Sequence, residues 1–199
     1  MKQIVKSILI ACAALLWIGC PMGGPSDEGD APDEGEAHIW YVSAAAADGG
    51  DGQSWQRAFR HPQRAVNAAG DGEVIKVSEG AYGPWPGNPD NAVIWMKPGV
   101  DLYGGYHIVN GEQVGRDPES HSSDLWGVSY GEDESDWLRS VHIVLGASDT
   151  RLDGFSIMEG ITYLDSGDNE LYSGSLDDPR YWGAGMWNNS VEKLRVHDC

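Results

Sequence analysis

Residues 139–160 read RSVHIVLGASDTRLDGFSIMEG and contain two short strand-like runs, 142–145 and 150–157, on either side of a tight corner at 146–149. Apolar and other side chains alternate along them, and a period of two places alternate side chains on opposite faces of a strand. The side chains expected to stack in the core are Ile143, Leu145, Leu152, Phe155 and Ile157. Neither run can form a core alone, so the fold depends on similar segments elsewhere.

Two other segments repeat this pattern of strand, glycine-containing corner and strand. They are residues 93–106, VIWMKPGVDLYGGY, and residues 185–199, GMWNNSVEKLRVHDC. Aligning the three segments places Leu102, Leu152 and Val196 at matching positions. The sequence between the segments is taken up by two polar stretches, 109–137 and 161–182, which we expect to be loops. Stacked repeats with insertions that leave as loops are typical of a solenoid.

The part of the chain before these repeats has elements of both kinds. Residues 38–43 and 72–78 have the composition of strands, with a Gly/Asp-rich loop at 44–54 after the first. A helix is expected from about His61, because Pro62 suits the first turn and Gly70 the C-terminal cap. Its apolar face is formed by Ala65, Val66 and Ala69.

The first 37 residues are expected to be a targeting segment and a tether. Lys2 and Lys6 precede an eleven-residue apolar run at 8–18, too short to span a bilayer and typical of a signal peptide. The sequence Gly19-Cys20 directly after it resembles a bacterial lipobox, in which the cysteine is lipidated. Ordinary signal-peptidase cleavage, which would release a secreted protein, is the alternative. We therefore expect a signal peptide at 1–19 and an acidic, disordered tether at 20–37.

The charge of the chain is strongly negative. Its 199 residues include 13 Lys and Arg against 31 Asp and Glu, a formal net charge of −18. This balance argues against nucleic-acid partners, which bind basic surfaces, and against anionic polysaccharides unless a metal ion bridges the two. Solubility at a cell surface is the simplest explanation for such acidity.

Essentially all of residues 38–199 resembles the bacterial right-handed parallel β-helix proteins, which are pectate-lyase-like surface proteins of the choice-of-anchor type. The segments that carry the resemblance are YVSAAAADGGDGQSWQRAF, QRAVNAAGDGEVIKVSEGAYGP, GVDLYGGY, RDPESHSSDL, VHIVLGASDTRLDGFSIMEG and GAGMWNNSVEKLRVHDC. It implies an all-β fold, a right-handed parallel β-helix that forms a single-stranded solenoid with a short N-terminal capping helix. Such proteins continue through more coils, so we expect residues 38–199 to be the N-terminal part of a domain truncated at Cys199.

The fold family includes polysaccharide lyases, whose β-elimination needs calcium held by carboxylates and a nearby Lys or Arg as base. Weak calcium candidates are Asp48, Asp51, Asp165, Asp168 and Glu170. Each acidic cluster is more simply a solvated loop. We assign no catalytic residue, because no base can be placed with an acidic trio on one face. His142 and His197 are expected on the outer surface of strands.

The aromatic residues give the sharper functional signal. Exposed Trp and Tyr side chains on loops can stack on sugar rings, although long loops also order themselves by tucking their aromatics onto the fold. The candidate carbohydrate contacts are Trp85, Trp126, Trp137 and Trp182. Three further tryptophans are expected in the core or the cap: Trp40, Trp55 and Trp95.

Together these observations predict a lipoprotein of the bacterial cell envelope, either in the outer membrane or extracellular. Cys20 is the expected lipidation site and the membrane the first partner. The folded part is expected to have a structural role or to bind carbohydrate or another envelope component, with no cofactor except, in one interpretation, calcium. The alternative is an enzyme, a calcium-dependent polysaccharide lyase or a glycosidase.

Overall fold

The computed structural model describes residues 37–130, 138–159, 185–188, 193–197 and 199. The chain divides into two compact units, Met1–Asp30 and Ala31–Cys199, and all of the described residues belong to the second. Within the described ranges, no helix is long and apolar enough to cross a membrane.

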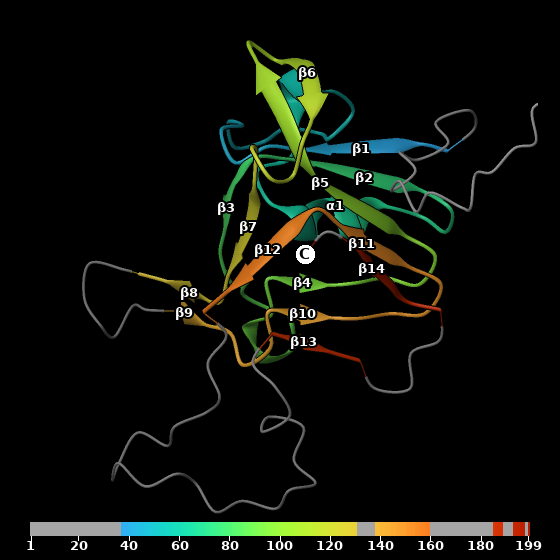
Figure 1. Cartoon of the computed structure of the whole chain (residues 1–199), viewed down its shortest axis with the longest axis vertical. Helices are drawn as coiled ribbons and strands as arrows, with labels where there is room; N and C mark the ends of the chain where they lie inside the picture. Colours follow the sequence, from blue (N-terminus) through green and yellow to red (C-terminus); the bar gives the residue numbers. More distant parts are fainter. Residues whose placement is uncertain (1–36, 131–137, 160–184, 189–192, 198) are drawn as a thin grey trace, which may run out of the picture. The chain divides into compact units, whose positions relative to one another are not determined.

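The largest sheet has six strands (Figure 1). Five of them are parallel and lie in the order β1 (Ile39–Val42), β2 (Val74–Ser78), β5 (Asp101–Val109), β11 (Arg151–Asp153) and β14 (Arg195–His197). The sixth, β6 (Glu112–Arg116), folds back antiparallel onto β5. The Asn110-Gly111 turn between β5 and β6 has φ of 53° and 79°, the left-handed pair that a two-residue hairpin requires.

Two three-stranded parallel sheets and one antiparallel pair complete the β structure. One sheet has the order β13 (Met186–Trp187), β10 (Val144–Leu145) and β4 (Ile94–Trp95). The other has the order β12 (Phe155–Met158), β7 (Ser123–Trp126) and β3 (Gly80–Tyr82). The antiparallel pair consists of β8 (Val128–Ser129) and β9 (Leu138–Arg139).

The same corner recurs before four strands of the large sheet. The residue two positions ahead of β2, β5, β11 and β14 has a left-handed backbone: Gly72, Gly99, Asp149 and Lys193, with φ of 78°, 75°, 55° and 53°. Neighbouring corners are bonded, since Gly72 N donates to Gly99 O at 2.8 Å and Gly99 N to Ser148 O at 3.2 Å. The last two corners carry side chains, and Lys193 Nζ lies 3.0 Å from Asp149 Oδ1. Stacked corners hold the strands in register.

One core joins the three parallel sheets. Its buried side chains include Ile75, Ile94, Leu102, Leu125, Val144, Leu152 and Phe155. Leu102 pairs with Leu152, and Leu152 with Val196, so the alignment of these three positions is confirmed. Of the residues expected to stack, Ile143, Leu145, Leu152 and Phe155 are buried, and the partly buried Ile157 packs against the core.

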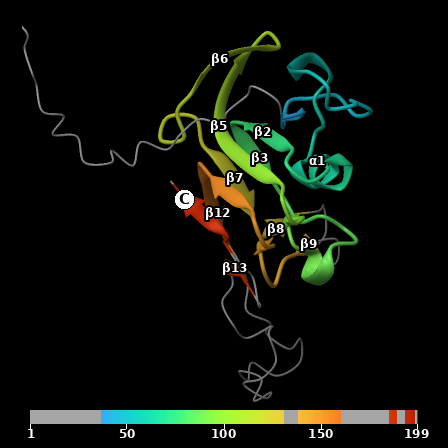
Figure 2. The same ribbon diagram turned by 90° about the vertical axis from the view of Figure 1, so that its right-hand side faces the viewer.

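The only helix longer than a single 3-10 turn in the described part of the chain is α1 (Pro62–Ala68). It packs against β1, β2 and β4, and Figure 2 shows it on one side of β2 and β3. Its expected apolar face is confirmed, because Ala65, Val66 and Ala69 are buried. The predicted cap is wrong: Ala69 is the C-terminal cap residue and Gly70 has no positive φ.

The prediction of a single-stranded, right-handed parallel β-helix is contradicted. The described strands form several small sheets, parallel and antiparallel, and no closed solenoid is detected among them. The prediction treated residues 109–137 as a polar loop leaving a stack of parallel strands. Instead β6, β7 and β8 lie in that stretch, and the Asn110-Gly111 turn reverses the chain into an antiparallel hairpin.

Two details of the central segment also differ from expectation. The run 150–157 is divided into β11 and β12 at Gly154, whose φ is 76°. His142 is not a surface residue: its side chain is fully buried and its ring stacks on Trp187, with 5.5 Å between centroids. His142 is covered by Trp187, and its Nδ1 lies 3.3 Å from Asp90 Oδ2.

Candidate functional site

The candidate site begins at β4, a strand at the edge of its sheet. Ile94 donates its amide to Ile143 O, directly before β10, and Met96 donates its amide to Leu145 O of β10. The amide and carbonyl of Trp95 therefore point away from the sheet, toward α1. A buried edge leaves such groups without partners unless another element supplies them.

Gln63 of α1 supplies both partners for Trp95. Its Oε1 accepts from Trp95 N at 2.7 Å, and its Nε2 donates to Trp95 O at 3.3 Å. The same amide accepts from Asn88 Nδ2 at 2.9 Å and donates to Asn67 Oδ1 at 2.9 Å. Gln63 is only 1% exposed, and its four hydrogen bonds are partly buried. This side chain fixes the backbone of Trp95.

The indole of Trp95 is 51% exposed, which makes the expectation of a core or cap position wrong. It borders a depression of about 450 Å³. The other lining residues are Gln63, Val66, Asn67, Met96, Lys97 and Pro98. Val66 and Met96 are buried apolar residues of this lining, and Pro98, Asn67 and Lys97 are exposed. Asn67 contributes an amide and Lys97 an ammonium group, which also donates to Ala69 O. Binding sites for small molecules combine such apolar walls with a few polar groups.

His61 sets the start of the helix that carries Gln63. Its Nδ1 accepts from Gln63 N at 3.1 Å, and its Nε2 donates to Gly83 O at 2.8 Å. Burial lowers the pKa of His61 to about 4, although the bond to Gly83 opposes this shift. The ring is therefore neutral at physiological pH, the state that can cap a helix through Nδ1.

Of the expected carbohydrate contacts that the structure describes, neither Trp85 nor Trp126 lines this depression. Trp85 is half-buried and its ring packs on His61, with 4.6 Å between centroids. Trp126 is half-buried in β7, and its Nε1 is buried without a hydrogen-bond partner. Trp137 and Trp182 lie outside the described residues. Trp85 thus packs against the residue that caps α1, and its role in binding stays a prediction, as does that of Trp126.

Two of the expected calcium residues, Asp48 and Asp51, are described, and they line one depression. Asp51 pairs with Arg57 at 2.9 Å and Asp48 lies 3.6 Å from Arg60, so each of these exposed carboxylates already faces a cation. Asp165, Asp168 and Glu170 lie outside the described residues, as does Cys20.

One group of potential metal ligands, absent from the predicted set, does come together. Ligand atoms of Glu79, His107 and His121 lie within 4.8 Å of one another. His107 lies 28 residues and His121 lies 42 residues after Glu79 along the chain. The signal that could have placed them is the Asn110-Gly111 pair, since Asn-Gly is a strong sign of a hairpin.

Comparison with protein-family models, with curated proteins and with solved structures found no match in any of the three. The resemblance based on the sequence therefore stays a prediction about family, and the function must be argued from the site.

Proposed function

We propose that this protein binds a neutral carbohydrate in the depression beside Trp95, and that a lipid on Cys20 holds it at the bacterial cell surface. The observation that carries the binding proposal is the half-exposed Trp95 indole on a backbone clamped by Gln63. A backbone that is already held loses little conformational freedom when a ligand stacks on its side chain, so more of the contact energy is available for binding.

The chemistry of the depression favours a sugar over a purely apolar ligand. A sugar ring presents C–H groups on its faces and hydroxyl groups at its rim. The indole and the apolar lining residues suit the faces, while Asn67 and Lys97 offer hydrogen-bond donors to the hydroxyls. The net charge of −18 disfavours polyanionic glycans, which leaves neutral ones.

The binding test is a titration of the purified protein with neutral oligosaccharides that represent glucans, xylans, mannans and galactans, followed by calorimetry and tryptophan fluorescence. We expect one class to bind, and Trp95→Ala to weaken that binding at least about tenfold, a loss of ~1.4 kcal/mol. Tyr130→Ala is the matched control, because Tyr130 is an aromatic residue 60% exposed on another strand end. No binding across the panel, or equal weakening by both variants, would refute the proposal.

The anchor is tested separately by expressing the chain in bacteria with a radiolabelled fatty acid. Label is expected on the wild-type protein and not on Cys20→Ala, which should also leave the membrane fraction. An unlabelled wild-type protein, or label retained in the variant, would refute the anchor without affecting the binding proposal.

A further inference from the structure

Glu79, His107 and His121 form a compact cluster away from Trp95. Glu79 Oε1 lies 2.6 Å from His107 Nδ1, and Oε2 lies 2.6 Å from His121 Nδ1. The two imidazole rings are stacked, with 3.9 Å between centroids and 17° between planes. One carboxylate is therefore met by the same nitrogen of two parallel rings.

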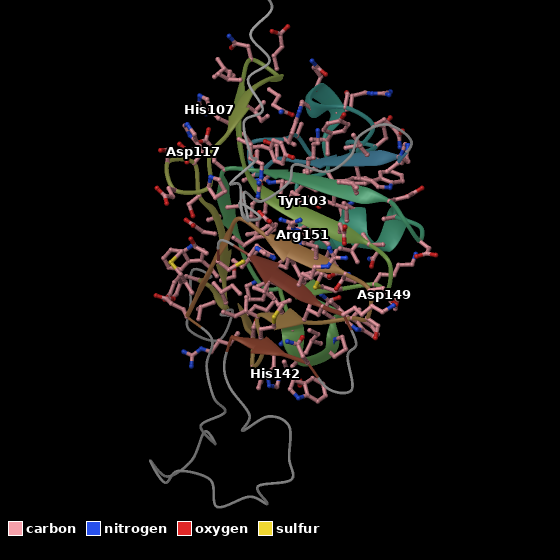
Figure 3. All side chains as sticks on the ribbon, turned by 45° about the vertical axis from the view of Figure 1, so that its right-hand side comes forward. Tyr103, His107, Asp117, His142, Asp149 and Arg151 are labelled. Carbon is pink, nitrogen blue, oxygen red and sulfur yellow. The ribbon has the colours of Figure 1, made fainter. Side chains whose placement is uncertain are left out.

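The backbones that carry these side chains are fixed by hydrogen bonds. Glu79, which joins β2 to β3, donates its amide to Tyr106 O at 2.9 Å. His107 lies in β5 opposite Gly115 of β6, and Figure 3 shows it beside the loop that carries Asp117. That loop returns His121 to the cluster, because His121 N donates to Asp117 O at 2.8 Å. Three separate segments thus place the three ligand groups without help from a ligand.

We propose that Glu79, His107 and His121 bind one divalent transition-metal ion of the zinc class, through the carboxylate and the Nδ1 atom of each histidine. Two imidazoles and one carboxylate are a ligand set used by Zn²⁺, Fe²⁺, Co²⁺, Ni²⁺ and Cu²⁺, and poorly suited to Ca²⁺ or Mg²⁺. The negative charge of the chain also raises the local concentration of cations.

Metal binding requires the three ligand groups to rearrange. Bonds of 2.0–2.1 Å in a tetrahedral site put neighbouring ligand atoms about 3.3 Å apart. The carboxylate and imidazole atoms, now at hydrogen-bonding distance, must therefore separate by several tenths of an ångström. The stacked rings must also tilt apart, because a metal bound at Nδ1 lies in the plane of each ring, and side chains between 29% and 38% exposed leave room for that rotation. The metal replaces the hydrogen bonds that hold the cluster together.

A depression borders the cluster. Glu79 lines this depression of about 440 Å³, together with Ser43, Trp55, Gln56 and Ile108 among others. Three protein ligands with an open position leave a place for water, the arrangement in which zinc activates water or binds an external ligand.

The test is a calorimetric titration of the purified, metal-free chain with ZnCl2, and a second titration with CoCl2 followed by visible absorption. We expect saturation at one equivalent of zinc and cobalt d–d bands typical of mixed nitrogen and oxygen ligands. His121→Ala and Glu79→Gln should each weaken zinc binding at least about tenfold. His38→Ala is the matched control, an exposed histidine outside the cluster, and should bind zinc as the wild type does.

Circular dichroism confirms that each variant is folded before its titration is interpreted. Zinc binding that survives the double variant His107→Ala/His121→Ala would overturn the proposal, as would a wild type that takes up no stoichiometric metal. Trp95→Ala should leave zinc binding unchanged, so failure here and failure of carbohydrate binding are separate results.

Discussion

Gln63 takes the place of a neighbouring strand for Trp95. Its Oε1 and Nε2 close two hydrogen bonds with the amide and carbonyl of Trp95, at 2.7 and 3.3 Å. A side chain of α1 thereby satisfies the backbone amide and carbonyl at the free edge of β4. The Trp95 side chain can point outward while its backbone stays hydrogen-bonded. Both the exposure of the Trp95 side chain and the hydrogen bonding of its backbone to Gln63 follow from the position of β4 at the edge of its sheet.

Replacing Gln63 by leucine should destabilise the protein by about 2–4 kcal/mol, because it removes four partly buried hydrogen bonds and leaves groups of Trp95 and Asn88 without this partner. Urea denaturation measures the change. Asn67→Ala removes only the bond from Gln63 Nε2 at an exposed side chain, and should cost less than about 1 kcal/mol. Equal losses in the two variants would contradict the role given to Gln63.

The free energy of unfolding should decrease as the pH is lowered, because His61 becomes protonated. Burial lowers the pKa of this residue to about 4, below its value of about 6.5 in an unfolded chain. The unfolded state therefore takes up a proton first as the pH falls. The contribution of His61 is complete above about pH 6.5 and is lost between there and about pH 4, by up to roughly 3 kcal/mol.

The matched variant for this prediction is His61→Asn, since asparagine is also a good N-cap residue but does not titrate. Denaturant midpoints between pH 7.5 and pH 4 should decline less steeply in the variant than in the wild type. Parallel curves would show that His61 does not contribute to the pH dependence.

Features governed by local periodicity could be predicted from the sequence. The strands beginning near residues 38, 72 and 99, the buried face of α1 and the alignment of Leu102, Leu152 and Val196 all follow from alternation or helical spacing and from the burial of apolar groups. The corners were predictable in part, because glycine occupies two of the four left-handed positions while Asp149 and Lys193 hold the others.

The candidate sites could not be predicted, because each depends on contacts between distant segments. Alternation in β4 does not reveal that its free edge faces α1, which decides the exposure of Trp95. His107 meets Glu79 and His121 only after the β5–β6 hairpin has formed in a stretch whose polarity indicated a loop. Polarity alone does not separate a solvated loop from a hairpin that faces water on one side.

Asp153 is fully buried between two arginines and should be among the least replaceable residues. Arg151 donates to its Oδ2 from Nη2 and Nε at 2.6 and 2.9 Å, while Arg116 bonds to Oδ1. Arg151 also lies over Tyr103, 5.3 Å from the ring centroid (Figure 3). Removing one partner of a buried ion pair leaves the opposite charge uncompensated.

Asp153→Ala should therefore lower the free energy of unfolding by about 3–5 kcal/mol, measured by chemical denaturation. The exposed pair of Lys193 with Asp149 is the comparison, since both side chains are more than half exposed. Lys193→Ala should change the stability by less than about 1 kcal/mol, because water screens such pairs. An Asp153 variant as stable as the Lys193 variant would contradict this account.

Gly104 and Gly115 give a test of close backbone approach in the large sheet. Neither has a positive φ, so alanine fits both backbones. A Cβ at Gly104 would lie 2.3 Å from Gly154 O, a backbone atom that cannot rotate away, whereas a Cβ at Gly115 meets nothing within 4 Å.

Gly104→Ala should lower the free energy of unfolding by at least about 2 kcal/mol through overpacking. Gly115→Ala should be neutral or stabilising by up to about 1 kcal/mol, because it reduces the freedom of the unfolded chain. Thermal denaturation of the two variants decides the matter: a tolerated Gly104→Ala would mean that β5 and the Gly154 turn lie farther apart than the hydrogen-bonded register of β5 and β11 requires.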